Sequence, residues 1–191
     1  MKIIKLFLWA LIFVMGNNKF LIPIDKTSTR EYREAVLIER YFISKHPCIA
    51  KKPKVLKEIR SMIYHKRILS EKYGIDYYLE LTRPMHESER FRKINSLTKG
   101  KAGETGWEQI MPKTGKMLGY DKKKLKILKF NLECGSKFYS QLVKRYKGDY
   151  AKALAYYNGG GKFMKIPDAI YYSNRVINMR NDLVSYLNKY L

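Results

Sequence analysis

Apolar residues at helical spacing, interrupted by Pro and Gly, most constrain the fold of this 191-residue chain. Over residues 53–73 the apolar positions are Val55, Leu56, Ile59, Met62, Ile63 and Ile68. That spacing places them on one face of a helix. Similar patterns predict further helices, over residues 32–44, 77–89, 131–146, 150–157 and 170–191. Alternation at period two is nearly absent, so we expect a mainly all-α fold.

The N-terminus has the pattern of an export signal. Lys2 and Lys5 precede an apolar run over residues 6–15, and the chain turns polar from Gly16. Ten helical residues span about 15 Å, half of a hydrocarbon core of about 30 Å, so a membrane span is disfavoured. Residues 1–16 are therefore expected to be a signal peptide, or an uncleaved signal anchor. Either alternative predicts an exported protein.

A short extension separates this signal from the main domain. Ser28 and Glu31 have the spacing of a capping box before the first expected helix. Pro47 ends that helix, and a basic linker precedes Pro53. We expect residues 17–52 to form a helical extension and linker, and residues 53–191 to form the main domain.

The charge balance narrows the classes of partner. Lys and Arg number 39 and Asp and Glu number 17, so the net charge is 39 − 17 = +22. Such a charge favours polyanions, but the lysines are scattered along the chain, so nucleic acid is not expected. Membrane contact is expected only through the N-terminal segment, if it is uncleaved. Cys48 and Cys134 allow one disulfide or two free thiols, and His46, His65 and His86 lack ligand spacing. Neither a metal nor a cofactor is expected.

The stretch 85–114 carries the most chemistry. It begins with an isolated acid, Glu87, followed by Ser88. A general acid must stay neutral near pH 7, which requires apolar cover such as Met85 and Phe91 can provide. The alternative is a solvated glutamate paired with a neighbouring arginine.

Three later groups suit a polar polymer. Gln109 lies in a Gly-rich loop and can orient a sugar amide or hydroxyl, and Tyr157 and Asn158 combine a phenol with an amide. Tyr172 can line a cleft together with these groups. Taken singly, each signal is weak: an ordinary turn glutamine is the favoured interpretation of Gln109, and a helix end or a packed helix is the alternative for the tyrosines and Asn158. Together they favour a cleft for an extended polar polymer.

The order of these motifs resembles the soluble lytic transglycosylase domain. The matching motifs are Glu87-Ser88, Gly106-x-x-Gln109-Ile110-Met111-Pro112, Asn131-x-x-x-Gly135, Ala155-Tyr156-Tyr157-Asn158-Gly159 and Tyr172-x-x-Arg175-Val176. The resemblance spans about 55–180. That family shares an α-helical, lysozyme-like fold with goose-type lysozyme. The resemblance therefore implies a lysozyme-like transglycosylase domain over residues 53–191.

By this resemblance Glu87 is the catalytic residue. The family's glutamate protonates the oxygen that links N-acetylmuramic acid (MurNAc) to N-acetylglucosamine (GlcNAc). It then deprotonates the muramic 6-hydroxyl, which closes a 1,6-anhydro ring, so one carboxylate suffices. The matching substrate-binding positions are Ser88, Ser96, Gln109, Tyr157, Asn158 and Tyr172.

The resemblance also implies where the protein works. Its substrate would be the glycan strands of peptidoglycan, its location the bacterial cell envelope or periplasm, and no cofactor would be needed. General wall turnover and a local role beside secretion or conjugation machinery both stay open.

Departures from the family pattern keep two alternatives open. Gln109 follows Glu87 by 109 − 87 = 22 residues, a few more than is usual, and Trp107-Glu108 replaces Leu-Met. Glu104 or Glu108 is then either a solvated loop charge, the favoured interpretation, or a second carboxylate that activates water. The second case would make the protein a muramidase. A non-catalytic wall-binding or secretion-accessory protein is the other alternative.

Overall fold

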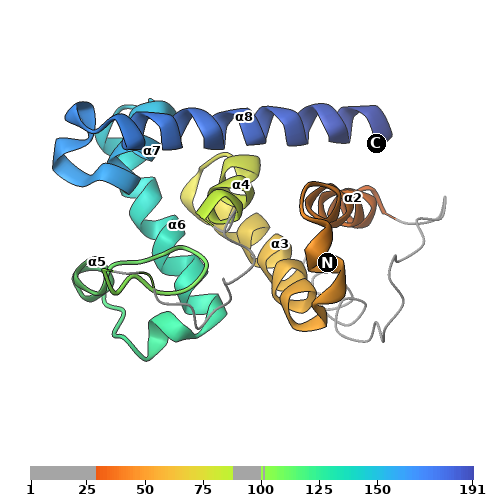
Figure 1. Ribbon diagram of the computed structural model, residues 1–191, viewed down its shortest axis with the longest axis horizontal. Helices are drawn as coiled ribbons and strands as arrows, with labels where there is room; N and C mark the ends of the chain where they lie inside the picture. The colour runs from red at the N-terminus through yellow and green to blue at the C-terminus, as the bar shows by residue number, and fades with distance from the viewer. Residues whose placement is uncertain (1–28, 88–99, 101) are drawn as a thin grey trace.

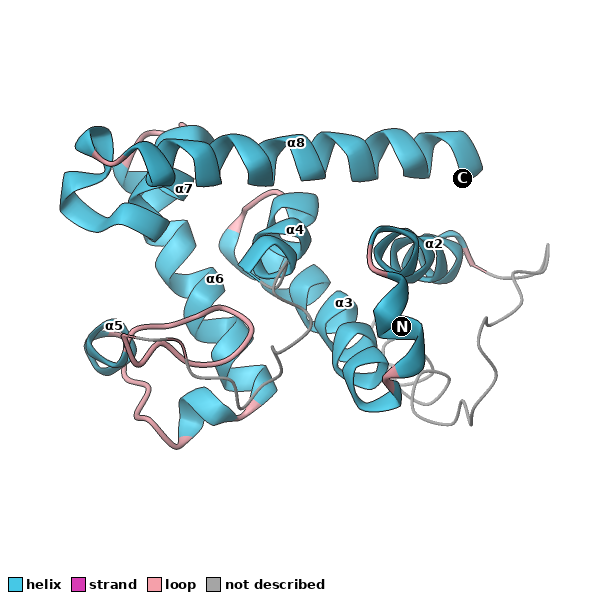
Figure 2. Cartoon of the chain, in the orientation of Figure 1, coloured by secondary structure: helices cyan, strands magenta, loops and turns pink. Residues whose placement is uncertain are grey.

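The described part of the computed structural model, residues 29–87, 100 and 102–191, consists mainly of helices joined by loops and turns (Figures 1 and 2). Over these residues no strand occurs beyond a single antiparallel bridge between Thr105 and Ile110. The expected all-α class is therefore confirmed. No helix in this part of the chain is both long and apolar enough to cross a membrane.

The elements follow the expected helical segments with shifted boundaries. In chain order they are α2 (Arg30–Lys45), η1 (Pro47–Lys51), α3 (Pro53–Tyr73), α4 (Tyr77–Glu87), α5 (Pro112–Met117), η2 (Lys124–Lys126), α6 (Leu128–Arg145), α7 (Tyr150–Gly159), η3 (Gly160–Lys165) and α8 (Pro167–Tyr190). The last helix begins three residues before its expected start at 170, because Pro167 suits a first helical turn.

Local signals explain most helix ends. Gly74 ends α3 in the left-handed conformation, at φ 64°, and the Asp76 carboxylate accepts a hydrogen bond from the Leu79 N–H at the start of α4. Thr29 caps α2 by accepting from the Tyr32 N–H, whereas Ser28 lies outside the described residues. Pro84 lies inside α4, and the helix continues past it to Glu87.

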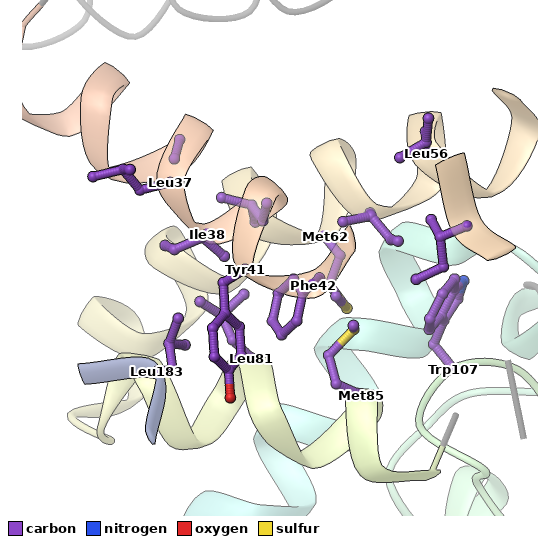
Figure 3. Close-up of a cluster of buried hydrophobic side chains, with 14 of the residues drawn as sticks. Leu37, Ile38, Tyr41, Phe42, Leu56, Met62, Leu81, Met85, Trp107 and Leu183 are labelled. Carbon is purple, nitrogen blue, oxygen red and sulfur yellow. The ribbon is translucent and has the colours of Figure 1, made fainter. Parts of the chain in front are cut away.

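One apolar core joins helices from both ends of the chain. Tyr41 and Phe42 of α2 lie against Met62 of α3, Met85 of α4 and Leu183 of α8 (Figure 3). The extension is therefore part of the main core, through α2. The division of the chain at residues 52 and 53 stays a prediction.

A buried network of four charges ties α3 and α4 to the loop before α5. The side chains of Lys66, Glu80, Arg83 and Glu108 have no exposed surface. Lys66 Nζ lies 2.8 Å from Glu80 Oε2 and 2.5 Å from Glu108 Oε1. Arg83 Nη2 lies 2.6 Å from Glu80 Oε1, and Arg83 Nη1 pairs with Glu108 Oε2. Ser136 of α6 donates a hydrogen bond to Glu80 and accepts one from Lys66 at 2.8 Å.

The network is closed and electrically neutral. Each cation contacts both carboxylates, so positive and negative groups alternate around a ring. Desolvating four charges is costly, and only such complete pairing offsets the cost. Loss of one member therefore leaves an uncompensated charge in the core.

Replacing Lys66 with Met should lower the free energy of unfolding by about 3–5 kcal/mol, because both glutamates then share one cation. Adding Glu108→Gln should recover part of that loss. Urea unfolding followed by circular dichroism measures both effects. Lys72→Met, which breaks the half-exposed pair with Glu133, is the matched control and should cost much less. Equal losses for the two lysine variants would contradict the assignment.

Acid should weaken the fold through Glu80. Burial by itself raises the pKa of Glu80, but the attraction of Arg83 and Lys66 outweighs burial and lowers the pKa to about 2. An unfolded glutamate has a pKa of about 4.3. Because the folded value is lower, the stabilisation is complete above the unfolded value and disappears as the pH falls through about 2.

The difference in unfolding free energy between the natural protein and Glu80→Gln should therefore shrink from about pH 5 to about pH 2. Urea titrations of both proteins at several pH values measure this difference. A constant difference over that range would show that the pKa of Glu80 is not lowered by folding.

Candidate active site

The carboxyl end of α4 lies beside the start of α8. Glu87 is the last residue of α4, and its side chain lies outside the described part, as do Ser88 and Ser96. The ring of the preceding residue, His86, contacts Tyr172 edge to face with centroids 5.1 Å apart. Tyr172 is buried. The structure thus places the expected late tyrosine next to the end of the helix that carries Glu87.

The loop with Gln109 is a tight turn. Thr105 and Ile110 exchange two backbone hydrogen bonds of 3.0 Å. Between them Gln109 has a φ of 44°, which is strained for a residue with a side chain. Its Nε2 donates to the Gly106 carbonyl at 2.6 Å. The loop therefore fixes the half-buried amide of Gln109 in one orientation.

Asn131 of α6 holds this loop by its backbone. Its Oδ1 accepts from the Glu108 N–H at 3.0 Å, and its Nδ2 donates to the Thr105 carbonyl at 2.9 Å. Gly106 has a φ of 74°, and a Cβ there would lie 2.6 Å from the Asn131 side chain. Glycine is thus required at 106 for both its conformation and its size.

Gly135 makes room for the Glu108 side chain. It lies one helical turn after Asn131, and a Cβ on it would meet Glu108 Oε2 at 2.4 Å. The Asn131-x-x-x-Gly135 motif therefore has a physical explanation. Its first residue binds the loop's backbone, and its second admits a buried carboxylate.

Tyr157 joins the same network from the end of α7. Its hydroxyl donates toward Glu108, with 2.9 Å to the backbone carbonyl and 3.2 Å to Oε2. The Arg83 guanidinium lies 4.6 Å from the centre of its ring, a cation–π arrangement. The neighbouring Asn158 is exposed. The structure therefore brings Tyr157 to the loop of Gln109, as expected for one site.

Glu108 differs from both sequence interpretations. It is fully buried and paired with Lys66 and Arg83, so it is neither a solvated loop charge nor a base free to activate water. The sequence pattern did not predict that Lys66, Glu80 and Arg83 would form a buried ion-pair network with this residue. One signal was present: Lys66 continues the apolar stripe of Ile59, Met62 and Ile63, where a charge must find a buried partner.

The two cysteines do not form a disulfide with each other. Cys48 and Cys134 are free thiols, and burial raises the pKa of Cys134 to about 12, which makes it a poor nucleophile. Among the residues that the structure describes, no three His, Cys, Asp or Glu side chains form a group able to hold a metal ion.

Gly135→Ala should destabilise the site, because the added methyl group displaces Glu108 from its ion pairs. We expect a lower melting temperature and a parallel loss of activity. The control is Gly161→Ala, since a Cβ at 161 meets nothing within 4 Å. Differential scanning calorimetry of both variants provides the measurement. A melting temperature for Gly135→Ala as high as that of the control would show that Glu108 is not held tightly.

Among solved structures, that of an inactive mutant of the lytic transglycosylase Slt from Pseudomonas aeruginosa is similar in fold. The TM-score is 0.54 and the sequence identity 14%, with 95% of this chain and 41% of that chain covered. This chain thus spans less than half of that protein. No curated protein matches the chain.

Residues 66–175 match the transglycosylase SLT domain family. The match covers more than half of the chain. It begins at Lys66 of the buried network and includes α4, the Gln109 loop, Tyr157 and Tyr172. The chain therefore belongs to the transglycosylase SLT domain family.

Proposed function

We propose that this protein is a peptidoglycan lytic transglycosylase that cleaves the β-1,4 bond between MurNAc and GlcNAc and leaves a 1,6-anhydro-MurNAc end. The observation that carries the proposal is the convergence of four elements. The end of α4, the Gln109 loop, Tyr157 of α7 and Tyr172 of α8 meet through the contacts of His86, Glu108 and Arg83. Family membership supports the reaction class.

In this proposal Glu87 is both the acid and the base. It first protonates the glycosidic oxygen, and the bond between that oxygen and C1 of MurNAc breaks as the proton arrives. The resulting carboxylate then takes the proton of the muramic 6-hydroxyl, whose oxygen bonds to C1 and closes the 1,6-anhydro ring. The carboxyl end of a helix carries partial negative charge, so the position of Glu87 favours the neutral acid needed for the first step.

The buried network keeps Arg83 from opposing this effect. Arg83 precedes Glu87 by one helical turn, where a lone cation would favour the charged carboxylate. Glu80 and Glu108 compensate its charge completely. Arg83 therefore acts in this proposal as a structural support for Tyr157, while Gln109 and Tyr157 orient the sugar.

A second candidate, a muramidase of the same fold, is favoured by one observation. The half-buried Glu104 has a carboxylate oxygen, Oε2, that is shielded from solvent and has no hydrogen-bond partner among the residues that the structure describes. The same carboxylate lies against Gly100, where a Cβ would be only 2.1 Å away. A carboxylate without a partner can activate water, which would give a reducing end instead of an anhydro end.

We further propose that the protein acts in the cell envelope, after export directed by residues 1–16. The N-terminal basic and apolar sequence supports this location. Peptidoglycan is then its substrate, and Ser88, Ser96, Asn158 and Tyr172 complete the substrate contacts. A local role beside secretion or conjugation machinery is compatible with the same reaction, and the experiments that follow distinguish the enzyme from a non-catalytic wall-binding protein.

Glu87→Gln should lower the release of muropeptides from purified sacculi by about 100-fold or more, because general acid–base catalysis is lost. Mass spectrometry of the products from the protein without residues 1–16 provides the measurement. Anhydro ends are expected from the parent and almost none from the variant. Unchanged release by Glu87→Gln would exclude Glu87 as the acid.

Glu104→Gln is the matched control, since it removes another carboxylate of the same region. It should leave the anhydro products unchanged. Reducing ends from the parent that disappear in Glu104→Gln would establish the muramidase instead. Sacculus binding without any product would establish the non-catalytic role.

A further inference from the structure

An apolar groove lies between η3 and α8, on the connection between the two helices α7 and α8. In Figure 1 this connection lies at the end of the molecule opposite the carboxyl terminus. The groove has a volume of about 470 Å³ and is open to solvent. We call its lining residues the η3–α8 patch: Met164, Lys165, Pro167, Ile170, Tyr171 and Asn174.

The patch exposes large apolar side chains that folding normally covers. Met164 is 64% exposed, Tyr171 61% and Ile170 44%. Counted from Pro167, the other lining residues of α8 follow after three, four and seven positions, at Ile170, Tyr171 and Asn174. This spacing places them on one face of the helix. Three such residues in one groove form a continuous apolar surface, unlike single exposed apolar residues, and a contiguous surface is a candidate for an interaction site.

Two cations adjoin this apolar surface, since Lys165 lines the groove and Arg175 lies over Tyr171. Lys162 and Lys165 of η3 are exposed, and the Arg175 guanidinium lies 5.9 Å from the centre of the Tyr171 ring. The acid on this part of α8 is Asp168, in its first turn. The local balance is therefore positive, and it agrees in sign with the +22 charge of the chain.

We propose that the η3–α8 patch binds the surface of an anionic phospholipid bilayer. Apolar side chains flanked by lysines are the composition of surfaces that lie in a membrane interface. Tyr171 suits the headgroup region, because its ring is apolar and its hydroxyl polar. The lysines can extend their charged ends to lipid phosphates while their alkyl chains cover the apolar groups.

The lining favours a bilayer over a glycan strand. Sugar sites need several polar groups that fix hydroxyls, and the patch supplies only Asn174 and Lys165 beside four less polar residues. Positive charge around the groove gives complementarity to lipid phosphates. This inference extends the sequence expectation, which limited membrane contact to the N-terminal segment. It does not depend on the proposed reaction.

Co-sedimentation with vesicles of phosphatidylglycerol and phosphatidylcholine tests the proposal, using the chain without residues 1–16 to remove the apolar segment. The triple variant Met164→Ser, Ile170→Ser, Tyr171→Ser should lower the partition coefficient by about tenfold or more, because apolar burial drives interfacial binding. A matched control, Met117→Ser with Ile127→Ser, removes residues that are 66% and 51% exposed elsewhere, and should change binding less than about twofold.

A second pair of variants tests the charges. Lys162→Gln with Lys165→Gln should weaken binding to anionic vesicles more than Lys122→Gln with Lys123→Gln, although each pair removes two exposed lysines. Equal losses for the two pairs would indicate attraction by net charge alone and would overturn the patch. Melting temperatures measured for each variant and for the parent check that these substitutions of exposed residues leave the fold intact.

Three other results would overturn the proposal. In the first, the triple variant binds vesicles as well as the parent does. In the second, it loses affinity for purified sacculi while vesicle binding persists, which would assign the patch to glycan. Sedimentation velocity could instead show a dimer that only the triple variant loses, which would assign the patch to a second copy. Because the vesicles contain no peptidoglycan, a failure of vesicle binding would not count against the proposed reaction. Muropeptide release by the triple variant tests the reaction separately from membrane binding.

Discussion

The site depends on the buried ring formed by Lys66, Glu80, Arg83 and Glu108. These four charges come from α3, α4 and the loop before α5, and Ser136 adds α6 to the same contacts. In a low-dielectric interior, an incomplete ring would cost several kcal/mol, so the three segments must meet in one arrangement. The ring therefore sets the position of the loop relative to α4, and with it the distance between Gln109 and the end of that helix.

The same ring explains a departure from the family pattern. Trp107 and Glu108 occupy positions where the related motif has Leu and Met, and both are completely buried. Trp107 lies in the main core (Figure 3). Its indole N–H donates a hydrogen bond to Glu58 at 2.7 Å. Glu108 is possible in the core because Lys66 and Arg83 neutralise it and Gly135 leaves space for it. The loop thus keeps its tight turn with different side chains.

The proposed active site and the proposed membrane contact use different residues of α8. Tyr172 is buried against His86 beside α4, whereas Tyr171 is exposed in the groove with η3. Adjacent residues on a helix point about 100° apart, so one helix can serve both surfaces. An enzyme held at a membrane by this patch would have its proposed cleft on a separate face, available to glycan strands.

The sequence by itself determined the helices and the order of the motifs, because helical period, Pro, Gly and capping residues act over a few residues. Gly74 at the end of α3 and the Asp76 cap at the start of α4 are local signals of this kind, and the all-α class follows from the same period. Only the tertiary structure decided the state of Glu108 and the role of Lys66, since their pairing joins residues 108 − 66 = 42 positions apart. A carboxylate in a loop looks solvated until the fold removes its water and supplies its cations, and that depends on contacts that no local pattern encodes.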